Sequence, residues 1–113
     1  MIAAAEKFAG DYVAIGAPAW ERQKGLPSEG IHPAAEAGLC GMLLAEDLGG
    51  KAMSKSAMAR VMEELSKADM GYAFVLIVHN NLMNAIADNG TEEQKARNLP
   101  AMLSGDCLGA FLL

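Results

Sequence analysis

A run of seven apolar residues, 72–78 (YAFVLIV), constrains the fold of this chain more than any other feature. The run is too short to cross a bilayer, which takes about 20 apolar residues, and its composition alone is compatible with a buried strand. However, apolar residues at helical spacing continue through Leu82, Met83 and Ile86 without a turn signal. We therefore predict a helix over residues 71–88 that is apolar, and buried, on most sides.

The composition favours a single, mostly helical domain. The chain has 113 residues, and 52% of them are apolar, which excludes a disordered protein. Ala and Met are abundant and aromatic residues make up only 5%, a balance that favours helices over strands. The net charge of −5 argues against nucleic acid as a general partner, because an acidic surface repels phosphates. The N-terminal segment also lacks the pattern of a secretory signal.

The N-terminal segment is predicted to form one amphipathic helix over residues 1–16, since its apolar residues recur at helical spacing. Gly16 and Pro18 are expected to end that helix. The residues that follow, 20–27, are predicted to form a polar connector.

A second, short helix is expected between residues 28 and 37. Ser28 could cap it, but Pro33 would then lie in the helix interior and remove a backbone hydrogen bond. The alternative is a start near Pro33, where proline is tolerated. In either case Gly38 is predicted to end the helix.

Residues 38–50 (GLCGMLLAEDLGG) are rich in glycine and are predicted to form a structured loop. Ser54 is the expected N-cap of a third helix that extends to about Lys67. Glu63 and Lys67 have the i,i+4 spacing of an ion pair in that helix. Its apolar stripe is Met58, Val61, Met62 and Leu65.

The segment TEEQ at residues 91–94 matches a capping box and predicts the start of a fifth helix. Pro100 is expected to interrupt that helix, with Asn98 capping a last turn. The apolar residues 107–113 (CLGAFLL) are predicted to form a buried strand. A lone strand leaves its backbone groups unpaired, so the pattern suggests five helices from a longer chain, followed by the first strand of a further domain.

Four segments of the chain form a pattern when they are taken in order: GLCGMLLAEDLGG (38–50), ARVMEELSKAD (59–69), VHNNLMNAIADNGTEEQKARNLPAML (78–103) and SGDCLGAFLL (104–113). Together they resemble the acyl-CoA dehydrogenase family. The family has a Gly-rich stretch ending in P-E-E-x-G-G, an E-E-L on the next helix, a G-T-x-E-Q-K capping box, an L-P, and a G-E/D before a strand. This chain departs from that pattern at Ala45 and Asp47, where the family usually has Pro and Glu.

The resemblance implies an all-α fold of about five helices in an up-and-down arrangement. Residues 1–105 would form the N-terminal helical domain, and residues 106–113 the first strand of a middle β domain. In the family, FAD lies between the middle and C-terminal domains, a glutamate of the C-terminal bundle removes the α-proton of an acyl-CoA, and the β-hydrogen leaves as hydride. The subunits usually form a homotetramer, and electron-transfer flavoprotein accepts the electrons. The flavin motif T-E-P-x-A-G-S-D would follow Leu113, so this chain is expected to be inactive alone.

The resemblance also implies two sets of site residues. One face of the fourth helix would line the far end of the acyl pocket, and its residues are Phe74, Ile77, Val78 and Asn81. Phe111 and Leu113 match the start of the strand that borders the flavin.

No catalytic residue and no metal site is assigned. Two alternatives remain open: an acyl-CoA oxidase or flavin monooxygenase of the same superfamily, and a helical interaction module without catalysis. A bacterial cytoplasm, or a mitochondrial matrix in a eukaryote, is the expected location.

The remaining carboxylates are expected to be structural. Glu63 and Glu64 are adjacent on a helix and point about 100° apart, so they do not converge on one substrate. Glu46 and Asp47 lack further oxygen ligands at the spacing of a cation site.

The histidines and cysteines are also expected to have packing roles. His32 and His79 lie on separate segments without metal-ligand spacing, and His79 is predicted to form a buried hydrogen bond. Cys40 and Cys107 are expected to be buried thiols, although the sequence leaves a disulfide between them open.

Overall fold

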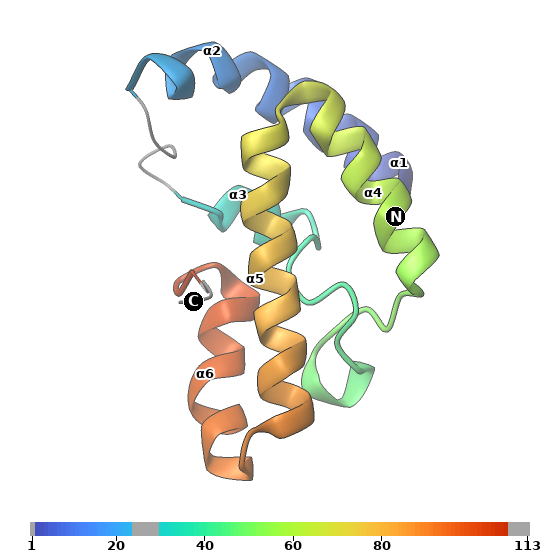
Figure 1. Cartoon of the computed structure of the whole chain (residues 1–113), viewed down its shortest axis with the longest axis vertical. Coiled ribbons are helices and arrows are strands. Elements are labelled where there is room, and N and C mark those ends of the chain that lie inside the picture. Colours follow the sequence, from blue (N-terminus) through green and yellow to red (C-terminus); the bar gives the residue numbers. More distant parts are fainter. Residues whose placement is uncertain (1, 24–29, 109–113) are drawn as a thin grey trace.

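The structure is a computed structural model that describes residues 2–23 and 30–108, and its elements are helical (Figure 1). In the described residues no strand is present, so the all-α expectation is confirmed. Most of the expected C-terminal strand, residues 109–113, lies outside the described residues. The α-helices are α1 (Ile2–Phe8), α2 (Ala14–Gln23), α3 (His32–Glu36), α4 (Lys55–Ala68), α5 (Met70–Asn89) and α6 (Glu92–Ser104), with a π-helix at Ala9–Val13 and a 3-10 helix at Glu46–Leu48.

The N-terminal helix continues past its expected end, because Gly16 and Pro18 both lie inside α2. Gly16 serves packing, since a Cβ at this position would overlap the ring of Trp20. Pro18 is exposed on the helix surface, where the carbonyl that loses its partner can contact water. Residues 20–23 are therefore helical rather than part of a connector.

Aromatic contacts hold α2 against the rest of the molecule, although α2 itself has no buried residue. The ring of Trp20 stacks on Tyr72 of α5 with centroids 5.1 Å apart, and it also meets Tyr12 at 5.4 Å. Phe8 and Tyr12 stack in turn at 5.2 Å. The π-helix between α1 and α2 adds a residue to one turn, which shifts the register of the side chains from one helix to the next.

The middle of the chain agrees with the sequence-based predictions in most respects. Helix α3 begins at His32 with Pro33 in its first turn, so the start near proline is confirmed; Ser28 lies outside the described residues. Gly38 follows α3 with a φ of 84°, the left-handed conformation expected of a glycine that ends a helix. The segment after it forms a folded loop with one 3-10 turn.

Helix α4 begins as predicted, with the Ser54 side chain accepting a hydrogen bond from the Ala57 amide at 3.1 Å. The predicted stripe of Met58, Val61, Met62 and Leu65 is buried. The predicted pair of Glu63 and Lys67 is wrong, because Lys67 instead contacts Glu64 at 3.2 Å. Glu64 is less exposed than Glu63, so its side chain has less freedom to turn away from Lys67.

The long apolar segment forms α5, so the helix prediction is confirmed, but α5 is buried on one side only. Asp69 ends α4 and caps α5, accepting a hydrogen bond from the Tyr72 amide at 3.0 Å. The opposite side of the helix is open, and Phe74 is 64% exposed. The prediction of burial on most sides is therefore wrong, because only one side of α5 is fully buried, while most of the remaining residues are half-buried. The buried residues of α5 are Tyr72, Ala73, Leu76, His79, Asn80 and Met83.

Helix α5 is long and apolar enough to span a membrane. It is the one helix with these properties in the described part of the chain. Its buried side belongs to the core of this domain, however, and that side includes two polar residues, His79 and Asn80. These are the properties of a core helix, and the finding is weak support for a membrane span.

Helix α6 starts with the predicted capping box. The Thr91 hydroxyl accepts a hydrogen bond from the Gln94 amide at 3.1 Å, and the Gln94 side chain accepts one from the Thr91 amide at 2.9 Å. The predicted interruption at Pro100 is wrong, because α6 runs through this exposed proline to Ser104. Asn98 lies inside the helix and donates to the Gln94 carbonyl at 2.9 Å.

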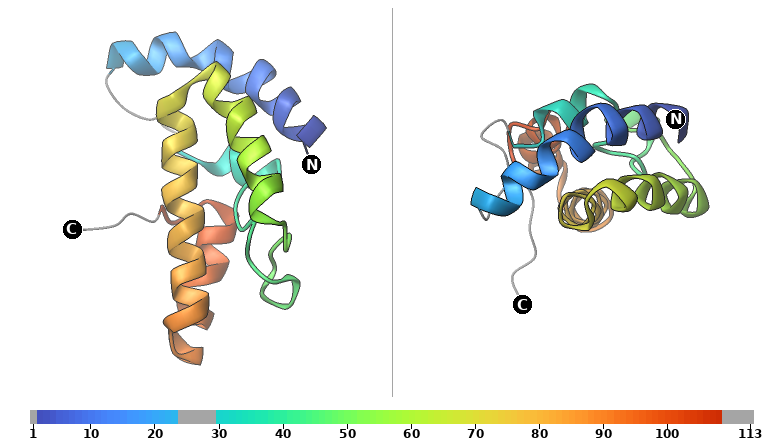
Figure 2. Two further views of the ribbon diagram at one scale, coloured as in Figure 1. Left: turned by 45° about the vertical axis from the view of Figure 1, so that its right-hand side comes forward. Right: turned by 90° about the horizontal axis from the view of Figure 1, so that it is seen from above.

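The helices form two layers around α5. Figure 2 shows α1 and α2 together on one side of α4 and the upper end of α5, with α6 beside the lower half of α5. One hydrophobic cluster joins α1, α3, α4 and the first half of α5; the other joins the second half of α5 to α6 and the glycine-rich loop. Helix α5 contributes to both clusters, so its position determines how the two halves of the domain meet.

We predict that Thr91→Ala lowers the free energy of unfolding by about 1 kcal/mol, because the substitution removes the side chain that satisfies a first-turn amide of α6. The measurement is a urea melt, with Thr91→Ser as the matched control that keeps the hydroxyl. An unchanged midpoint for the alanine variant would contradict this role of the cap.

Candidate functional site

The four residues expected to line a pocket lie together on the open side of α5. At about 100° per residue, positions 74, 77, 78 and 81 fall within an arc of about 100°. Phe74 and Asn81 are exposed, while Ile77 and Val78 are half-buried. The buried residues Leu76 and Met83 lie on the opposite side of the same helix. The structure therefore brings these four residues onto one face, which we call the outward face of α5.

A groove of about 300 Å³ runs beside the outward face, between α5 and α4. Its walls are mostly apolar, and its one ionisable group is the exposed carboxylate of Glu63. Such a groove can bind a hydrocarbon group by removing it from water, with little directional hydrogen bonding. The lining residues are Met62, Glu63 and Ser66 on α4, and Met70, Ala73, Phe74 and Ile77 on α5.

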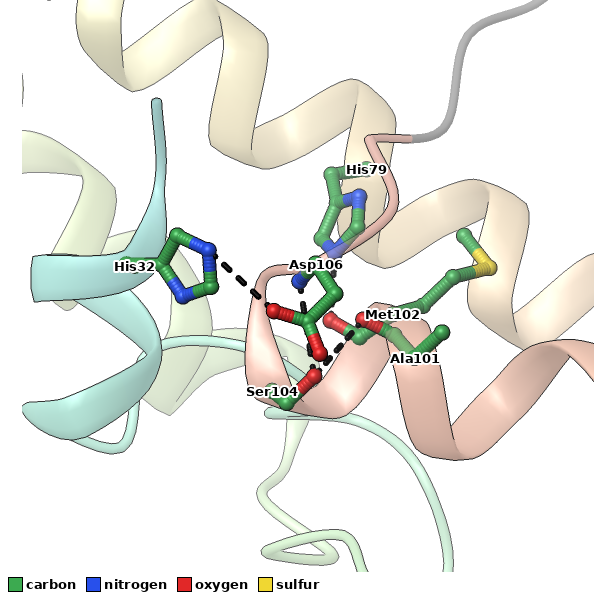
Figure 3. A network of polar contacts seen from close by, with 6 residues as sticks. All are labelled: His32, His79, Ala101, Met102, Ser104 and Asp106. Carbon is green, nitrogen blue, oxygen red and sulfur yellow. Dashed lines mark hydrogen bonds and ion pairs between the residues drawn. The ribbon is translucent and has the colours of Figure 1, made fainter. Parts of the chain in front are cut away.

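The core side of α5 contains a histidine that is fully buried. The His79 Nε2 lies 2.9 Å from the Met102 carbonyl of α6, so this nitrogen donates its hydrogen to the carbonyl (Figure 3). Burial lowers the pKa of His79 below its ordinary value, and the hydrogen bond to Met102 opposes that change in part. The imidazole is therefore neutral at pH 7 and joins α5 to the end of α6, which confirms the predicted packing role.

Asn80, the next residue, joins α5 to the glycine-rich loop. Its Oδ1 accepts a hydrogen bond from the Met42 amide at 2.9 Å, and its Nδ2 donates to the carbonyls of Leu39 at 3.0 Å and Leu76 at 2.8 Å. The side chain is 1% exposed, so these bonds replace contacts with water. Sequence reasoning missed this residue; the signal was an asparagine between His79 and Asn81, directly after the apolar run 72–78.

Backbone hydrogen bonds keep the glycine-rich loop folded against α5. The amides of Lys51, Ala52 and Met53 donate to the carbonyls of Gly41, Leu44 and Met42, respectively, at 2.8–3.0 Å. Gly50 permits this close packing, since a Cβ there would overlap the backbone of Leu44. The loop thus presents the Leu39 and Met42 backbone groups to Asn80 in a fixed position.

A second contact on the surface holds the end of α6. Figure 3 shows the His32 Nε2 beside the Asp106 carboxylate, at 3.2 Å, with both side chains largely exposed. The Ser104 hydroxyl donates to the Ala101 carbonyl and accepts from the Asp106 amide. Together with the buried bond of His79, this contact fixes the place from which the chain continues toward Phe111 and Leu113. Both of those expected flavin-site residues lie outside the described residues.

The other carboxylates do not assemble into a site. Glu63 and Glu64 point apart, as predicted, and Glu64 pairs with Lys67. Glu46 and Asp47 lie in the 3-10 turn. Across residues 2–23 and 30–108, no cluster of His, Cys, Asp and Glu could hold a metal ion.

The two cysteines differ from each other. Cys40 is a buried free thiol, as predicted, and burial raises its pKa to about 11, so it is protonated and a poor nucleophile at neutral pH. Cys107 is also free but is exposed, so the prediction of a buried thiol is wrong there. The reason is that the chain leaves the core after Gly105, which ends α6 with a φ of 85°.

Comparison with known proteins identifies one family. Residues 1–106 match the family model described as "Acyl-CoA dehydrogenase, N-terminal domain". Among curated proteins, the chain is 29% identical to isobutyryl-CoA dehydrogenase of Dictyostelium discoideum over 94% of its own length and 26% of the relative. It is 35% identical to (2S)-methylsuccinyl-CoA dehydrogenase of Cereibacter sphaeroides (90% and 19%) and 32% identical to an acyl-CoA dehydrogenase of Bacillus subtilis (94% and 28%). The chain thus spans about a quarter of the length of these relatives.

We predict that Asn80→Ala lowers the free energy of unfolding by about 2–4 kcal/mol, because it leaves the Met42 amide and the Leu39 carbonyl buried without partners. The neighbouring substitution Asn81→Ala is the matched control, and on the exposed side of α5 it should change this free energy by less than about 0.5 kcal/mol. Urea melts of both variants make the comparison. Equal effects would contradict the proposed link between α5 and the loop.

The lowered pKa of His79 predicts a loss of stability in mild acid. The unfolded chain takes up a proton near pH 6.5, the ordinary histidine pKa, whereas the folded chain does so only at lower pH. The contribution is therefore complete above about pH 7 and is lost as pH falls through 6.5 toward the folded pKa.

The measurement is the urea midpoint between pH 7 and pH 5 in a His32→Gln background, which removes the other histidine. Adding His79→Gln should flatten the pH dependence, since glutamine keeps an amide donor but does not titrate in this range. The same slope with and without His79 would show that its protonation is not coupled to folding.

Proposed function

The chain belongs to the acyl-CoA dehydrogenase family as its N-terminal domain, and from this membership we propose that it forms a wall of the acyl pocket in an FAD-dependent enzyme. That enzyme would oxidise the α,β CH–CH bond of an acyl-CoA thioester. The observation that supports the proposal is the outward face of α5. Phe74, Ile77 and Val78 form an apolar surface on the side of the helix opposite its buried residues, where Phe74 is exposed and the other two are half-buried.

The contribution of this chain is binding and exclusion of water. An alkyl chain gains about 25 cal/mol for each Å² of apolar surface that leaves water, so an apolar wall holds the substrate without reacting with it. Asn81 lies at one end of the wall and adds a polar group that can meet the edge of the acyl moiety. Glu63 is the one carboxylate on the adjoining groove, but it is exposed and has no neighbour among the described residues that would orient it as a base.

Bound flavin would supply the acceptor for a hydride from the substrate. The two buried polar side chains of α5 are not available to a flavin, since the His79 Nε2 and the amide of Asn80 already bond to backbone groups. No step of the reaction is therefore assigned to this chain. In the full enzyme we propose acyl-CoA as substrate, electron-transfer flavoprotein as electron acceptor and a homo-oligomeric assembly, all by analogy with the family.

A short or branched acyl group fits the outward face best. Phe74 projects from this face and would shorten any pocket that the face lines. Two of the three relatives support a short or branched acyl group, since their names specify isobutyryl-CoA and (2S)-methylsuccinyl-CoA.

The proposal predicts a change of chain-length preference in a chimera. Residues 1–106 would replace the matching segment of the Dictyostelium isobutyryl-CoA dehydrogenase, and dye reduction would be followed with isobutyryl-CoA and octanoyl-CoA. Phe74→Ala should raise the ratio of kcat/KM for the longer substrate to that for the shorter one by about tenfold, because it lengthens the pocket. The unfused chain should give no turnover.

Ile15→Ala is the matched control, because Ile15 is at least as exposed as Phe74 but lies on α2. It should leave the ratio unchanged. A chimera that binds flavin and turns over isobutyryl-CoA, yet shows the same ratio with and without Phe74→Ala, would overturn the placement of this face at the acyl pocket.

A further inference from the structure

Helix α6 is attached to the domain by little buried surface. Its fully buried residues are Leu99 and Met102, whereas α4 buries four residues and α5 buries six. Among the described residues, the hydrophobic cluster that includes α6 has four fully buried members, and the cluster around α1, α4 and the first half of α5 has fifteen. Segments with few buried apolar contacts open at a lower free energy than the core. Helix α6 can therefore open while the larger cluster stays intact.

A buried histidine bonds across the junction between α5 and α6. His79 is the one side chain of α5 from Met70 to Ala87 that titrates near neutral pH, and it is 0% exposed. Its Nε2 lies 2.9 Å from the Met102 carbonyl, which also accepts the Gly105 amide at 3.3 Å where α6 ends. A neutral imidazole keeps its bond here, whereas an imidazolium would lose its hydration. The charge of His79 is thus opposed as long as α6 stays in place.

We propose that α6 is released by acid: when His79 takes up a proton, α6 separates from α5 while α1, α4 and the first half of α5 stay folded. Separation returns the imidazolium to water, which the closed arrangement excludes. The connection between the two helices is short, and the capping bonds between Thr91 and Gln94 lie within α6 and its own cap. The helix can therefore move as an intact unit. This inference does not rest on the proposed function.

The charged groups around His79 do not replace the hydration that an imidazolium would lose. The charged side chains of α6 all lie in its first two turns, away from Met102. The buried titratable group of the glycine-rich loop is Cys40, which is protonated at neutral pH. The Asp106 carboxylate lies 3.2 Å from the His32 Nε2, on the surface (Figure 3). The other charged side chains of the surrounding elements are Glu36 of α3, Glu46, Asp47 and Lys51 of the loop, and Glu92, Glu93, Lys95 and Arg97 of α6.

Two contacts oppose the release and make it an equilibrium. The Leu103 side chain packs so closely on Gly41 and Gly49 of the loop that a Cβ on either glycine would overlap it. The contact of His32 with Asp106 holds the end of α6 to α3. Proton uptake shifts this equilibrium, because burial lowers the pKa of His79 and the open form binds the proton more tightly. As pH falls below about 6.5, the open form should gain up to about tenfold for each pH unit until the closed form is also protonated.

The test is amide hydrogen exchange of the 113-residue chain, followed by NMR from about pH 7.5 to about pH 5.5, where carboxylates stay ionised. The amides of Leu99 and Met102 report on α6, and those of Val61 and Leu65 report on α4. Protection factors, which correct for the intrinsic effect of pH on exchange, should be at least about tenfold lower in α6 than in α4. Below about pH 6.5 the α6 factors should fall by up to about tenfold for each pH unit.

His79→Gln should remove the pH dependence of the α6 amides, since glutamine keeps an amide donor but does not titrate in this range. His32→Gln is the matched control: it removes a largely exposed histidine at the same end of α6 and should leave the pH dependence in place. A pH dependence that survives His79→Gln, or one that disappears in His32→Gln, would overturn the assignment to His79.

The wild-type chain alone also decides the question, even if His79→Gln fails to fold. Equal protection of α4 and α6 would overturn the proposal, because the domain would then open in one step. Protection of α6 that does not change between about pH 7.5 and about pH 5.5 would overturn it as well, because proton uptake would then not be linked to opening.

Discussion

The hydrogen bonds of His79 and Asn80 determine how α5 is rotated about its own axis, and the rest of the structure depends on that rotation. Apolar side chains lie on most sides of α5 itself, so the burial of apolar surface alone distinguishes poorly among possible rotations of this helix. Hydrogen bonds are directional, and here two adjacent residues direct theirs to the end of α6 and to the glycine-rich loop. Rotating α5 would leave buried polar groups without partners on both sides, at a cost that apolar contacts elsewhere could not offset.

Much of the fold could be predicted from local signals. Ser54 and the capping box at 91–94 mark the starts of α4 and α6, because a cap depends only on residues within one turn. The errors arose where a tertiary contact or solvent overrode a local rule. Gly16 lies beneath the Trp20 ring inside a helix, and the exposed prolines Pro18 and Pro100 leave their unpaired carbonyls near water.

The candidate site was predictable in its grouping but not in its surroundings. Positions 74, 77, 78 and 81 share a face in any regular helix, so their grouping follows from spacing alone. That this face is open depends on where the other helices pack, which no local pattern determines. The role of Asn80 was missed for a related reason: its partners Met42 and Leu39 lie 38 and 41 residues away in the sequence.

The composition of the outward face of α5 follows from the same hydrogen bonds. Phe74 and Ile77 belong both to the outward face and to the groove, whereas Val78 and Asn81 belong only to the outward face. Since His79 and Asn80 hold α5 in one rotation, these four residues stay on the side of the helix opposite Leu76 and Met83. The polar bonds of the buried side therefore determine which apolar residues the domain presents on its outward face.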